Sequence, residues 1–302
     1  MQKSQQRGEN RVVVILDALV GSAGISGEMS AIFGNLCCMF RRCLFSVLSV
    51  GPIPNHIAFI MDGNRRYAKR TQISTGHRVG FSALISVLRY CYEIGVKYVT
   101  IYAFSIDNFK RKPEEVQSTM DLMQEKIDEL LEEHSIVNKY GIRMNFWGNL
   151  NLLNDAVRLS VEKAMRNTSN NTGPVLSVCV AYTSTNEITH AIEKSCCQKT
   201  EMMKRRANGF ENGFVEKNTQ TMVTVVDLEM HLFSNDCPDP DIIIRTSGET
   251  RLSNFLLWQS SFSHLQNPAP LWPEFSLRHL VWAILSYQRA YPYLQNRSKK
   301  ML

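Results

Sequence analysis

Polar and charged residues that could bind phosphate follow the first hydrophobic segment of this chain. Asp62, Gly63 and Asn64 come directly after the apolar run that ends at Met61. A glycine there lets the backbone approach a ligand, and cations in the first turn of a helix oppose its dipole unless an anion binds between them. Four cations follow in the sequence: Arg65, Arg66, Lys69 and Arg70. We therefore predict a phosphate-binding site, with a solvated basic helix face as the alternative.

A second candidate phosphate site follows a later hydrophobic run. Arg245 and Arg251 are separated by hydroxyl residues and a glycine, and Ser253 comes two positions further on. Two guanidinium groups at this spacing can surround a diphosphate with forked hydrogen bonds. An arginine at the end of a buried strand is also unfavourable without an anion. A structural salt bridge from Arg245 to Glu249 is the alternative.

The two sites together indicate the kind of ligand. The sequence contains neither the phosphate-loop motif Gly-x-x-x-x-Gly-Lys-Ser/Thr nor a dinucleotide glycine motif, so the sites do not resemble nucleotide sites. Two diphosphate sites beside Asp62 suggest two small phosphorylated substrates and one divalent metal. Mg²⁺ fits best, because it binds through one or two carboxylates together with substrate phosphates.

Polar groups and aromatic rings are combined in the segment 103–111. Such a rim suits an apolar ligand with a polar head group. Ser105 and Asp107 fit a capped turn before the helix at Pro113 about equally well. His77 could donate a hydrogen bond to a phosphate, although a lone histidine is more often structural.

The segments that carry these residues alternate between strand-like and helix-like patterns. Apolar runs rich in Val, Ile and Tyr predict buried strands at 56–61, 97–104, 143–147, 175–181 and 241–244. Helical spacing follows at 80–94 and from Lys112, and a capping box is predicted at 184–187. Strands that alternate with helices need crossover connections. The sequence therefore predicts an α/β fold, a single domain with a mostly parallel central sheet flanked by helices.

In such a sheet, ligands bind beyond the carboxyl ends of the strands. The polar residues predicted at these ends are Asp62, Ser105, Asn149, Tyr182 and Arg245.

An N-terminal arm, residues 1–50, precedes the domain. Its residues 28–50 show helical spacing of apolar side chains, which predicts an amphipathic helix that either packs on the core or lies on a membrane surface. The domain itself is expected at 51–295, with an irregular surface insertion at 195–224. A short, basic and solvated tail is expected at 296–302.

The composition excludes several classes of protein. With 302 residues, of which 44% are hydrophobic and 21% charged, the chain can bury a substantial core, which excludes disorder, collagen and coiled coil. The net charge of +6 permits phosphate-rich partners or an anionic membrane. Because the basic residues cluster at strand ends beside a carboxylate, we expect no nucleic-acid partner. The eight cysteines lack metal-binding spacing and are expected to be reduced thiols in the cytosol.

Several motifs, in this order, resemble those of the cis-prenyltransferases, the undecaprenyl or dehydrodolichyl diphosphate synthase family. They are HIAFIMDGNRR at 56–66, YAFS at 102–105 with Asn108, RTSGE at 245–249, RLSNF at 251–255 and LWPEF at 271–275. The resemblance extends from about Gly51 to Tyr293. Arg65 and the helical arm are similar to the eukaryotic, plant-like branch of dolichol and rubber type.

This resemblance implies a Mg²⁺-dependent enzyme that condenses isopentenyl diphosphate onto an allylic diphosphate such as farnesyl diphosphate, and so makes polyprenyl diphosphate with Z double bonds. It implies catalytic roles for Asp62, Asn64 and Ser105, with the metal at Asp62. The residues that it implies for the allylic diphosphate are Gly63, Asn64, Arg65, Arg66, His77, Asn108 and Arg111, and those for isopentenyl diphosphate are Arg245, Arg251 and Ser253. The growing chain would enter a tunnel between the helix at 81–92 and the apolar stripe at 116–131.

The sequence departs from bacterial members of that family in three places. His264 stands where they have a metal-associated glutamate, so Mg²⁺ is expected to bind to Asp62 and the substrates alone. The loop before Gly76 lacks an arginine that they have. The C-terminal segment lacks the Arg-x-Gly motif with which homodimeric members complete a neighbouring active site.

The third departure predicts a heteromer. In the eukaryotic branch a Nogo-B-receptor-like prenyltransferase subunit supplies the missing motif, so we expect the complex at the cytosolic face of the endoplasmic reticulum membrane. An alternative of another class is a non-catalytic scaffold subunit of the same complex. Retention of Asp62 and of the site around Arg245 argues against that alternative.

Overall fold

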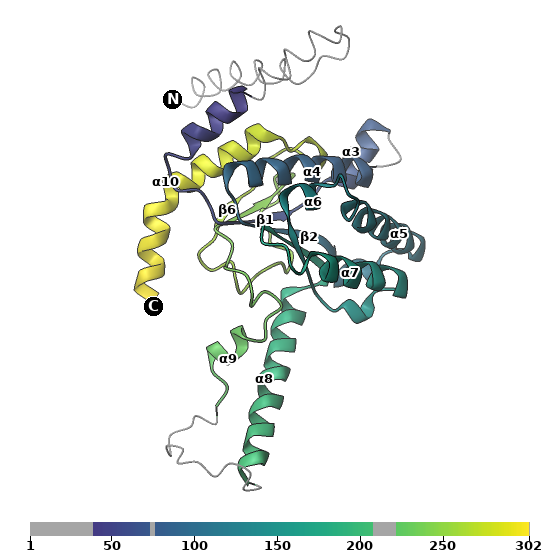
Figure 1. The fold of residues 1–302 in the computed structure, drawn as a ribbon, viewed down its shortest axis with the longest axis vertical. Helices are drawn as coiled ribbons and strands as arrows, with labels where there is room; N and C mark the ends of the chain where they lie inside the picture. Colours follow the sequence, from purple (N-terminus) through teal and green to yellow (C-terminus); the bar gives the residue numbers. More distant parts are fainter. Residues whose placement is uncertain (1–38, 73–75, 208–221, 302) are drawn as a thin grey trace.

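Six parallel strands form one sheet at the centre of the molecule (Figure 1). The computed structural model describes residues 39–72, 76–207 and 222–301. The order of strands across the sheet is β3-β4-β2-β1-β5-β6. Their bounds are β1 His56–Ile60, β2 Tyr98–Ser105, β3 Arg143–Trp147, β4 Val175–Tyr182, β5 Ile242–Arg245 and β6 His264–Gln266. The predicted α/β fold with a parallel central sheet is confirmed.

The strand β6 was not predicted. It has three residues, of which His264 and Gln266 are polar, so it lacks the apolar run that identified the other strands. Its place beside β5 is set by tertiary pairing, in which Ile242 lies opposite His264 and Ile244 opposite Gln266.

Helices alternate with the strands, and local residue types explain where α5 begins and where α4 ends. The helices are α3 Asn64–Thr71, α4 Gly76–Ile94, α5 Pro113–Leu130, α6 Ile136–Tyr140, α7 Asp155–Thr168, α8 Ser184–Ala207, α9 Val225–Glu229 and α10 Leu277–Met301. Pro113 fixes the first turn of α5, and Gly95 follows α4 with a φ of 101° that other residues rarely adopt. Three short 3-10 helices are η1 Ile106–Lys110, η2 Leu150–Leu152 and η3 Trp272–Glu274.

The two faces of the sheet are covered differently. On one face, side chains from α4, α5, α7 and α10 pack with Phe59, Met144 and Leu176 into the main hydrophobic core. On the other face a smaller cluster around Ile60 and Tyr182 packs against residues of the segments 233–237 and 252–256, which lie before and after β5. The main core therefore lies beneath the helices α4 and α5, which the sequence predicted to line a tunnel.

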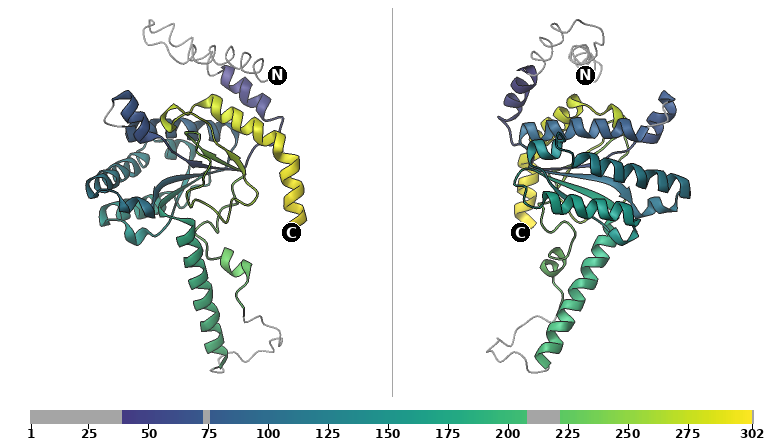
Figure 2. Two further views of the ribbon diagram at one scale, coloured as in Figure 1. Left: turned by 180° about the vertical axis from the view of Figure 1, so that it is seen from behind. Right: turned by 45° about the vertical axis from the view of Figure 1, so that its right-hand side comes forward.

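Part of the insertion that we expected to be irregular is a regular helix. The insertion expected at 195–224 begins inside α8, which continues to Ala207 and extends away from the body of the molecule with α9 beside it (Figure 2). Ser195 is buried there, and its hydroxyl donates to the Asp227 carbonyl of α9 at 2.9 Å. The basic tail expected at 296–302 is helical as far as Met301, as the last part of α10, and its solvation stays a prediction. The segment 208–221 lies outside the described residues.

The start of α8 also differs from the predicted capping box. The hydroxyl of Thr183 accepts a hydrogen bond from the Asn186 amide at 3.3 Å, one residue before the predicted cap. Glu187, predicted to close the box, is instead fully buried and bound to groups from other segments.

The described part of the N-terminal arm is a helix over residues 39–48. Its buried side chains are Phe45 and Leu48, and Arg41 pairs with Glu93 of α4 at 2.9 Å. Two of the apolar side chains in this predicted amphipathic helix, Phe40 and Val47, are more than half exposed. The remainder of the predicted amphipathic helix, residues 28–38, lies outside the described residues. No helix in the described ranges is both long enough and apolar enough to span a bilayer.

Candidate active site

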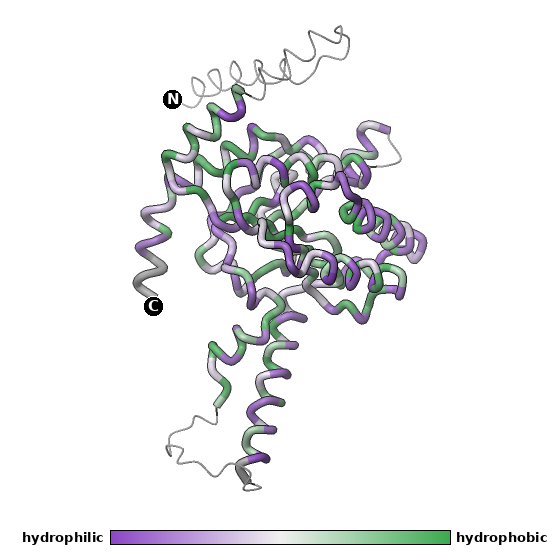
Figure 3. Tube along the Cα trace, viewed as in Figure 1, coloured by the Kyte–Doolittle hydropathy of each residue, from purple (hydrophilic) through white to green (hydrophobic). Residues whose placement is uncertain are grey.

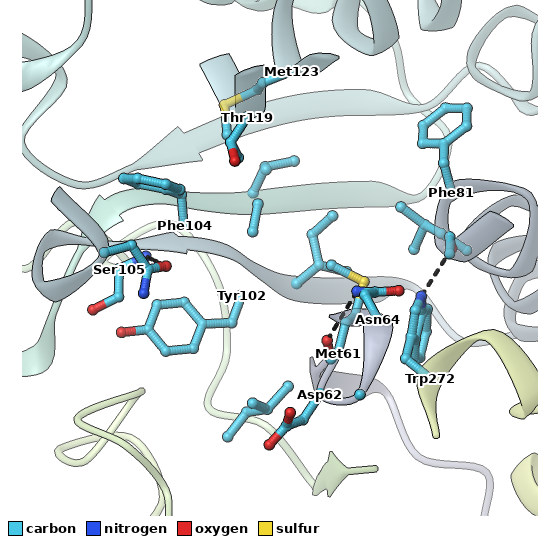
Figure 4. Close-up of a pocket in the computed structure, with 18 of the residues that line it drawn as sticks. Met61, Asp62, Asn64, Phe81, Tyr102, Phe104, Ser105, Thr119, Met123 and Trp272 are labelled. Carbon is cyan, nitrogen blue, oxygen red and sulfur yellow. Dashed lines mark hydrogen bonds between the residues drawn. The ribbon is translucent and has the colours of Figure 1, made fainter. Parts of the chain in front are cut away.

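A cavity of about 1300 Å³ opens at the carboxyl ends of the strands and continues between the sheet and the helices α4 and α5. Figure 4 shows Asp62, Tyr102 and Ser105 toward one end of it and Phe81 and Met123 toward the other. The residues that the family resemblance implied for the site, except His77, line this cavity: Asp62, Gly63, Asn64, Arg65, Arg66, Ser105, Asn108, Arg111, Arg245, Arg251 and Ser253. His77 lies in the first turn of α4, and its side chain is outside the described part of the chain.

The central interaction of the site joins Asp62, just after β1, to Arg245, the last residue of β5. Nη2 of Arg245 donates to Oδ2 of Asp62 at 2.8 Å, and its Nη1 donates to the Ser253 hydroxyl and to the Arg251 carbonyl, both at 2.5 Å. The Arg245 side chain is only 5% exposed, so a lost partner would leave a buried charge. The sequence predicted either an anion or Glu249 as the partner of Arg245. The structure corrects the Glu249 alternative, because the carboxylate that Arg245 contacts is Asp62.

Asp62 is held ionised by its cationic neighbours. Burial acts to raise the pKa of its carboxyl, but the hydrogen bond and charge of Arg245, and then those of Arg66, outweigh burial and hold the pKa below its ordinary value. Nη2 of Arg66 lies 3.2 Å from Oδ1 of Asp62 and also donates to the Ser247 hydroxyl at 2.7 Å. The site therefore presents an ionised carboxylate between two guanidinium groups.

Glu249 connects the two predicted phosphate sites. It pairs with Arg251 at 2.5 Å and with Arg66 at 3.8 Å, so it lies between an arginine of the first site and one of the second. The Arg66 side chain is 50% exposed and that of Arg251 is 64% exposed. Exposed ion pairs of this kind are weak, so a diphosphate can compete for both guanidinium groups.

Asn64, the first residue of α3, presents an unused acceptor. Its Nδ2 donates to the Met61 carbonyl at 3.3 Å, whereas its Oδ1 is buried and has no hydrogen-bond partner. A buried polar atom without a partner is unfavourable, so Oδ1 of Asn64 is suited to accept a hydrogen bond from a ligand or from water bound to it. The preceding residue, Gly63, has a φ of 113° and packs closely on Leu271, so a larger residue would not fit there.

Ser105 and Asn108 form a capping box at the start of η1, which bears out the capped-turn alternative. The Ser105 hydroxyl accepts from the Asp107 amide at 3.2 Å, and the Asn108 side-chain oxygen accepts from the Ser105 amide at 3.1 Å. Both residues also line the cavity. The cap therefore fixes their side chains at the rim of the site.

On the same rim, Arg65 and Arg111 both contact Glu115 of α5. The distances from their Nη1 atoms to Oε1 of Glu115 are 3.4 and 3.1 Å. One carboxylate thus holds two guanidinium groups beside the mouth of the cavity.

The interior of the cavity is largely apolar and matches the predicted tunnel. From α4 and α5 its apolar lining is Phe81, Leu84, Leu122, Met123, Ile127 and Leu130, and Thr119 and Lys126 add polar groups. The strands add apolar side chains that the sequence analysis did not assign to the tunnel: Ile101, Ala103, Met144, Phe146, Leu176 and Val178. Their strand period of two places alternate residues on the tunnel face, a signal that was present in the sequence.

Sequence reasoning missed some residues of the site and included others that lie elsewhere. Tyr102, Glu249 and Trp272 line the cavity but were not predicted as residues of the site. All three lie in the family motifs identified above, which could have indicated them. Asn149 and Tyr182, which were predicted at strand ends beside the ligand, do not line it. His264, which stands in place of the metal-associated glutamate, lies elsewhere as well. Its Nε2 is within hydrogen-bond distance of the Ser286 hydroxyl at 3.0 Å, and burial lowers its pKa.

The donor set fits a cation that is shared with substrate. Among the residues that the structure describes, no group of three or more His, Cys, Asp or Glu side chains could hold a metal alone. Asp62 nevertheless lines the cavity with a partly exposed, ionised carboxylate. One carboxylate with water and phosphate oxygens is a usual set for Mg²⁺, and it would not hold a metal that needs a full protein cage.

Comparison with known proteins agrees with this site. Residues 60–293 match the family described as putative undecaprenyl diphosphate synthase. The chain is 56% identical to a dehydrodolichyl diphosphate synthase of Solanum lycopersicum, over 92% of this chain and 99% of that protein. It is 41% identical to the dehydrodolichyl diphosphate synthase complex subunit of Homo sapiens, over 85% and 74% of the two chains. The crystal structure of lavandulyl diphosphate synthase from Lavandula x intermedia with dimethylallyl diphosphate is similar at a TM-score of 0.64 and 27% identity, over 78% of this chain and 95% of that one.

A parallel α/β sheet with arginines and one carboxylate at its strand ends, and with an apolar tunnel behind them, is the architecture of an enzyme that transfers apolar groups from diphosphates. The chain belongs to the undecaprenyl diphosphate synthase family, the cis-prenyltransferases, and it is 56% and 54% identical to dehydrodolichyl diphosphate synthases of two plants. The enzyme interpretation is accordingly favoured over the scaffold interpretation.

Proposed function

We propose that this chain condenses isopentenyl diphosphate with an allylic diphosphate, such as farnesyl diphosphate, and releases a polyprenyl diphosphate of dehydrodolichyl type with Z double bonds. One continuous cavity joins two arginine-lined sites to an apolar tunnel, and this observation carries the proposal. Two head groups and one growing hydrocarbon chain are what this reaction must hold together. The named activity of the tomato relative supports the same product class.

In the proposed reaction the allylic diphosphate binds at the start of α3. Gly63, Asn64 and Arg66 surround this position, and the helix N-terminus there favours an anion. The bond between C1 and the diphosphate oxygen breaks, and the guanidinium of Arg66 stabilises the negative charge that develops on the leaving group. Bound Mg²⁺ at Asp62 would neutralise part of the same charge.

Isopentenyl diphosphate binds at the second site, beside Arg245, Arg251 and Ser253. Its double bond attacks C1 of the allylic group and a new carbon–carbon bond forms. The C2 carbon of isopentenyl diphosphate then loses a proton to the released diphosphate, which leaves the new double bond. Ser105 and Asn64 lie at the rim and orient the reacting ends. The hydrocarbon chain extends into the apolar tunnel, where burial of each methylene contributes roughly 0.8 kcal/mol.

The direct test is incorporation of labelled isopentenyl diphosphate into farnesyl diphosphate, with and without Mg²⁺. We expect a ladder of polyprenyl products from the wild type and none from Asp62→Ala. A matched control is Asp155→Ala, which removes a carboxylate from the start of α7, outside the cavity. Incorporation by Asp62→Ala at the wild-type rate would contradict the proposed role of Asp62.

We also propose that activity needs a Nogo-B-receptor-like prenyltransferase subunit. The human relative that is 41% identical is named as a subunit of a complex, which supports a heteromeric assembly. The assay should therefore be run on the purified chain alone and with such a partner. Full activity of the chain alone would overturn the requirement for the partner.

A peripheral location at the cytosolic face of the endoplasmic reticulum membrane is the third proposal. The helix over residues 39–48 leaves Met39, Phe40 and Val47 exposed beside Arg42, a combination that suits a lipid surface with anionic head groups. Figure 3 shows this hydrophobic character in the short helix at the top of the view. Sedimentation with phosphatidylserine vesicles should fall in Phe40→Asp but not in the control Ser46→Asp. Fractionation of cells with organelle markers tests the compartment.

A further inference from the structure

The segment that carries the second substrate site has an unfavourable backbone. We call residues 251–257 the substrate loop. Ser253, Asn254 and Leu256 have φ values of 50°, 60° and 44°, in the left-handed region that disfavours residues other than glycine. Each such residue costs about 1 kcal/mol or more, so surrounding contacts must hold the loop in this conformation.

The first turn of α8 supplies those contacts. The backbone amide of Ser184 donates to the Asn254 carbonyl at 2.8 Å, and the Ser184 hydroxyl accepts from the Leu257 amide at 2.8 Å. The amide and the hydroxyl of Thr185 both donate to Oδ1 of Asn254 at 3.1 Å. Ser184 and Thr185 therefore bind the substrate loop at Asn254, which has a left-handed backbone, and at Leu257, which directly follows the left-handed Leu256.

A buried carboxylate anchors that turn of α8. Glu187 is fully buried, and it accepts hydrogen bonds from the Tyr182 hydroxyl, from the amide and hydroxyl of Ser234 and from Nε2 of Gln259. An ionised carboxylate accepts only, so this set of donors matches it. Gln259 follows the substrate loop in the chain, so Glu187 ties the start of α8 to the far end of the loop.

The loop in turn holds Arg245. The Ser253 hydroxyl and the Arg251 carbonyl are the two acceptors of Nη1 of Arg245, and both belong to the substrate loop. The Tyr102 hydroxyl also donates to the Ser253 carbonyl at 3.4 Å, and the Tyr102 ring stacks on Phe255 with centroids 4.7 Å apart. A shift of the loop would therefore move the acceptors that orient Arg245.

We propose that Ser184 and Thr185 are positioning residues, which hold the strained substrate loop so that Arg245 and Ser253 are ready for the diphosphate of isopentenyl diphosphate. This inference rests on the proposed function. Neither residue lines the cavity, so both act through the loop and not on substrate. The allylic site at the start of α3 is built from other segments, so its affinity should not depend on them.

The test uses the double variant Ser184→Ala/Thr185→Val in the complete protein, with its partner subunit where activity needs one. Loss of these two hydroxyl contacts should raise the KM for isopentenyl diphosphate about thirtyfold, because each such hydrogen bond contributes ~1 kcal/mol and 1.4 kcal/mol corresponds to about a factor of ten. The KM for farnesyl diphosphate should stay within about twofold of the wild type, on the same energy scale. Amide hydrogen exchange in residues 251–257 should become faster. Thr185→Ser keeps the hydroxyl and should behave as the wild type.

Thr189→Val is the matched control. Thr189 lies one turn further along α8 and is exposed, and its hydroxyl donates to the Thr185 carbonyl of the same helix at 2.8 Å. Equal increases in both KM values, or no change in KM and hydrogen exchange, would overturn the inference. If the double variant does not fold, Thr185→Val is the variant to measure, since Thr185 is exposed.

Failure of the proposed function would be seen separately, as absence of turnover by the wild type. Calorimetric titration with isopentenyl diphosphate then decides the inference by itself. Weaker binding by the double variant than by Thr189→Val supports it, and equal binding by the two overturns it.

Discussion

Gly80 of α4 leaves the space that the side chain of Asn64 occupies. A Cβ atom added at Gly80 would lie 2.2 Å from Oδ1 of Asn64 and 3.2 Å from Cδ1 of Trp272. The Trp272 indole in turn donates to the Gly80 carbonyl at 2.8 Å, which holds this turn of α4 against η3. Glycine is normally unfavourable within a helix, but at position 80 any larger residue would collide with the active-site residue Asn64.

The first prediction is that Gly80→Ala displaces Asn64 and lowers the rate of prenyl transfer by at least about tenfold, since misplacement of a reacting group by about 1 Å is enough to have such an effect. Alanine favours the helix, so stability should change less than activity does. Steady-state kinetics and thermal unfolding measure the two effects. In an Asn64→Ala background the same substitution should have little further effect. Additive losses in the double variant would contradict the proposed contact.

The second prediction concerns the pH dependence of activity. The pKa of Asp62 lies below its ordinary value because Arg245 and Arg66 outweigh the effect of burial. The Asp62 carboxylate is therefore ionised above that lowered pKa. Activity that depends on the ionised carboxylate is lost as the pH falls through this pKa. Arg66→Ala removes a hydrogen bond and a positive charge, so the acid limb of kcat/KM should move to higher pH. Arg65→Ala should leave this limb in place, because Arg65 pairs with Glu115 and not with Asp62.

The third prediction concerns the pH dependence of stability. His56 is buried, and burial lowers its pKa from 6.5 to about 4, although the Pro238 carbonyl and the charge of Asp241 act in the opposite direction. The unfolded chain binds this proton more readily, so the contribution of the neutral ring is fully present above pH 6.5 and is lost as the pH falls to about 4. The loss should reach about 3 kcal/mol.

Urea unfolding at several pH values measures this dependence. His56→Asn should flatten it between pH 4 and 6.5, because the amide does not titrate. His134→Asn is the control, since His134 is exposed. An unchanged slope in His56→Asn would show that other groups cause the loss.

The fourth prediction concerns the tunnel. Ile127 of α5 is 5% exposed and lines the cavity, so Ile127→Trp should fill part of the interior and shorten the products. Overpacking of this kind costs about 1–3 kcal/mol of stability. Chromatography of the dephosphorylated products shows their length. The control Ser118→Trp adds the same ring on the exposed face of α5 and should leave the length unchanged.

The sequence alone determined the order of elements and the nature of the site. Five strands were recognisable because each is a short apolar run, and the arginine-rich segments after β1 and β5 were recognisable because cations at strand ends need an anion. The motifs around Asp62 and Arg245 also carried the family resemblance, which the comparisons confirmed.

The tertiary structure decided which of these groups meet. Asp62 and Arg245 are 183 residues apart, and they pair because β1 and β5 are neighbours in the sheet, an order that no local pattern encodes. The same holds for β6, which exists only through its pairing with β5, and for the continuation of α8, whose Ser195 is buried by α9. Local periodicity predicts which face of a helix or strand is apolar. It does not predict which other element covers that face, because this depends on how all the elements pack together in the folded chain.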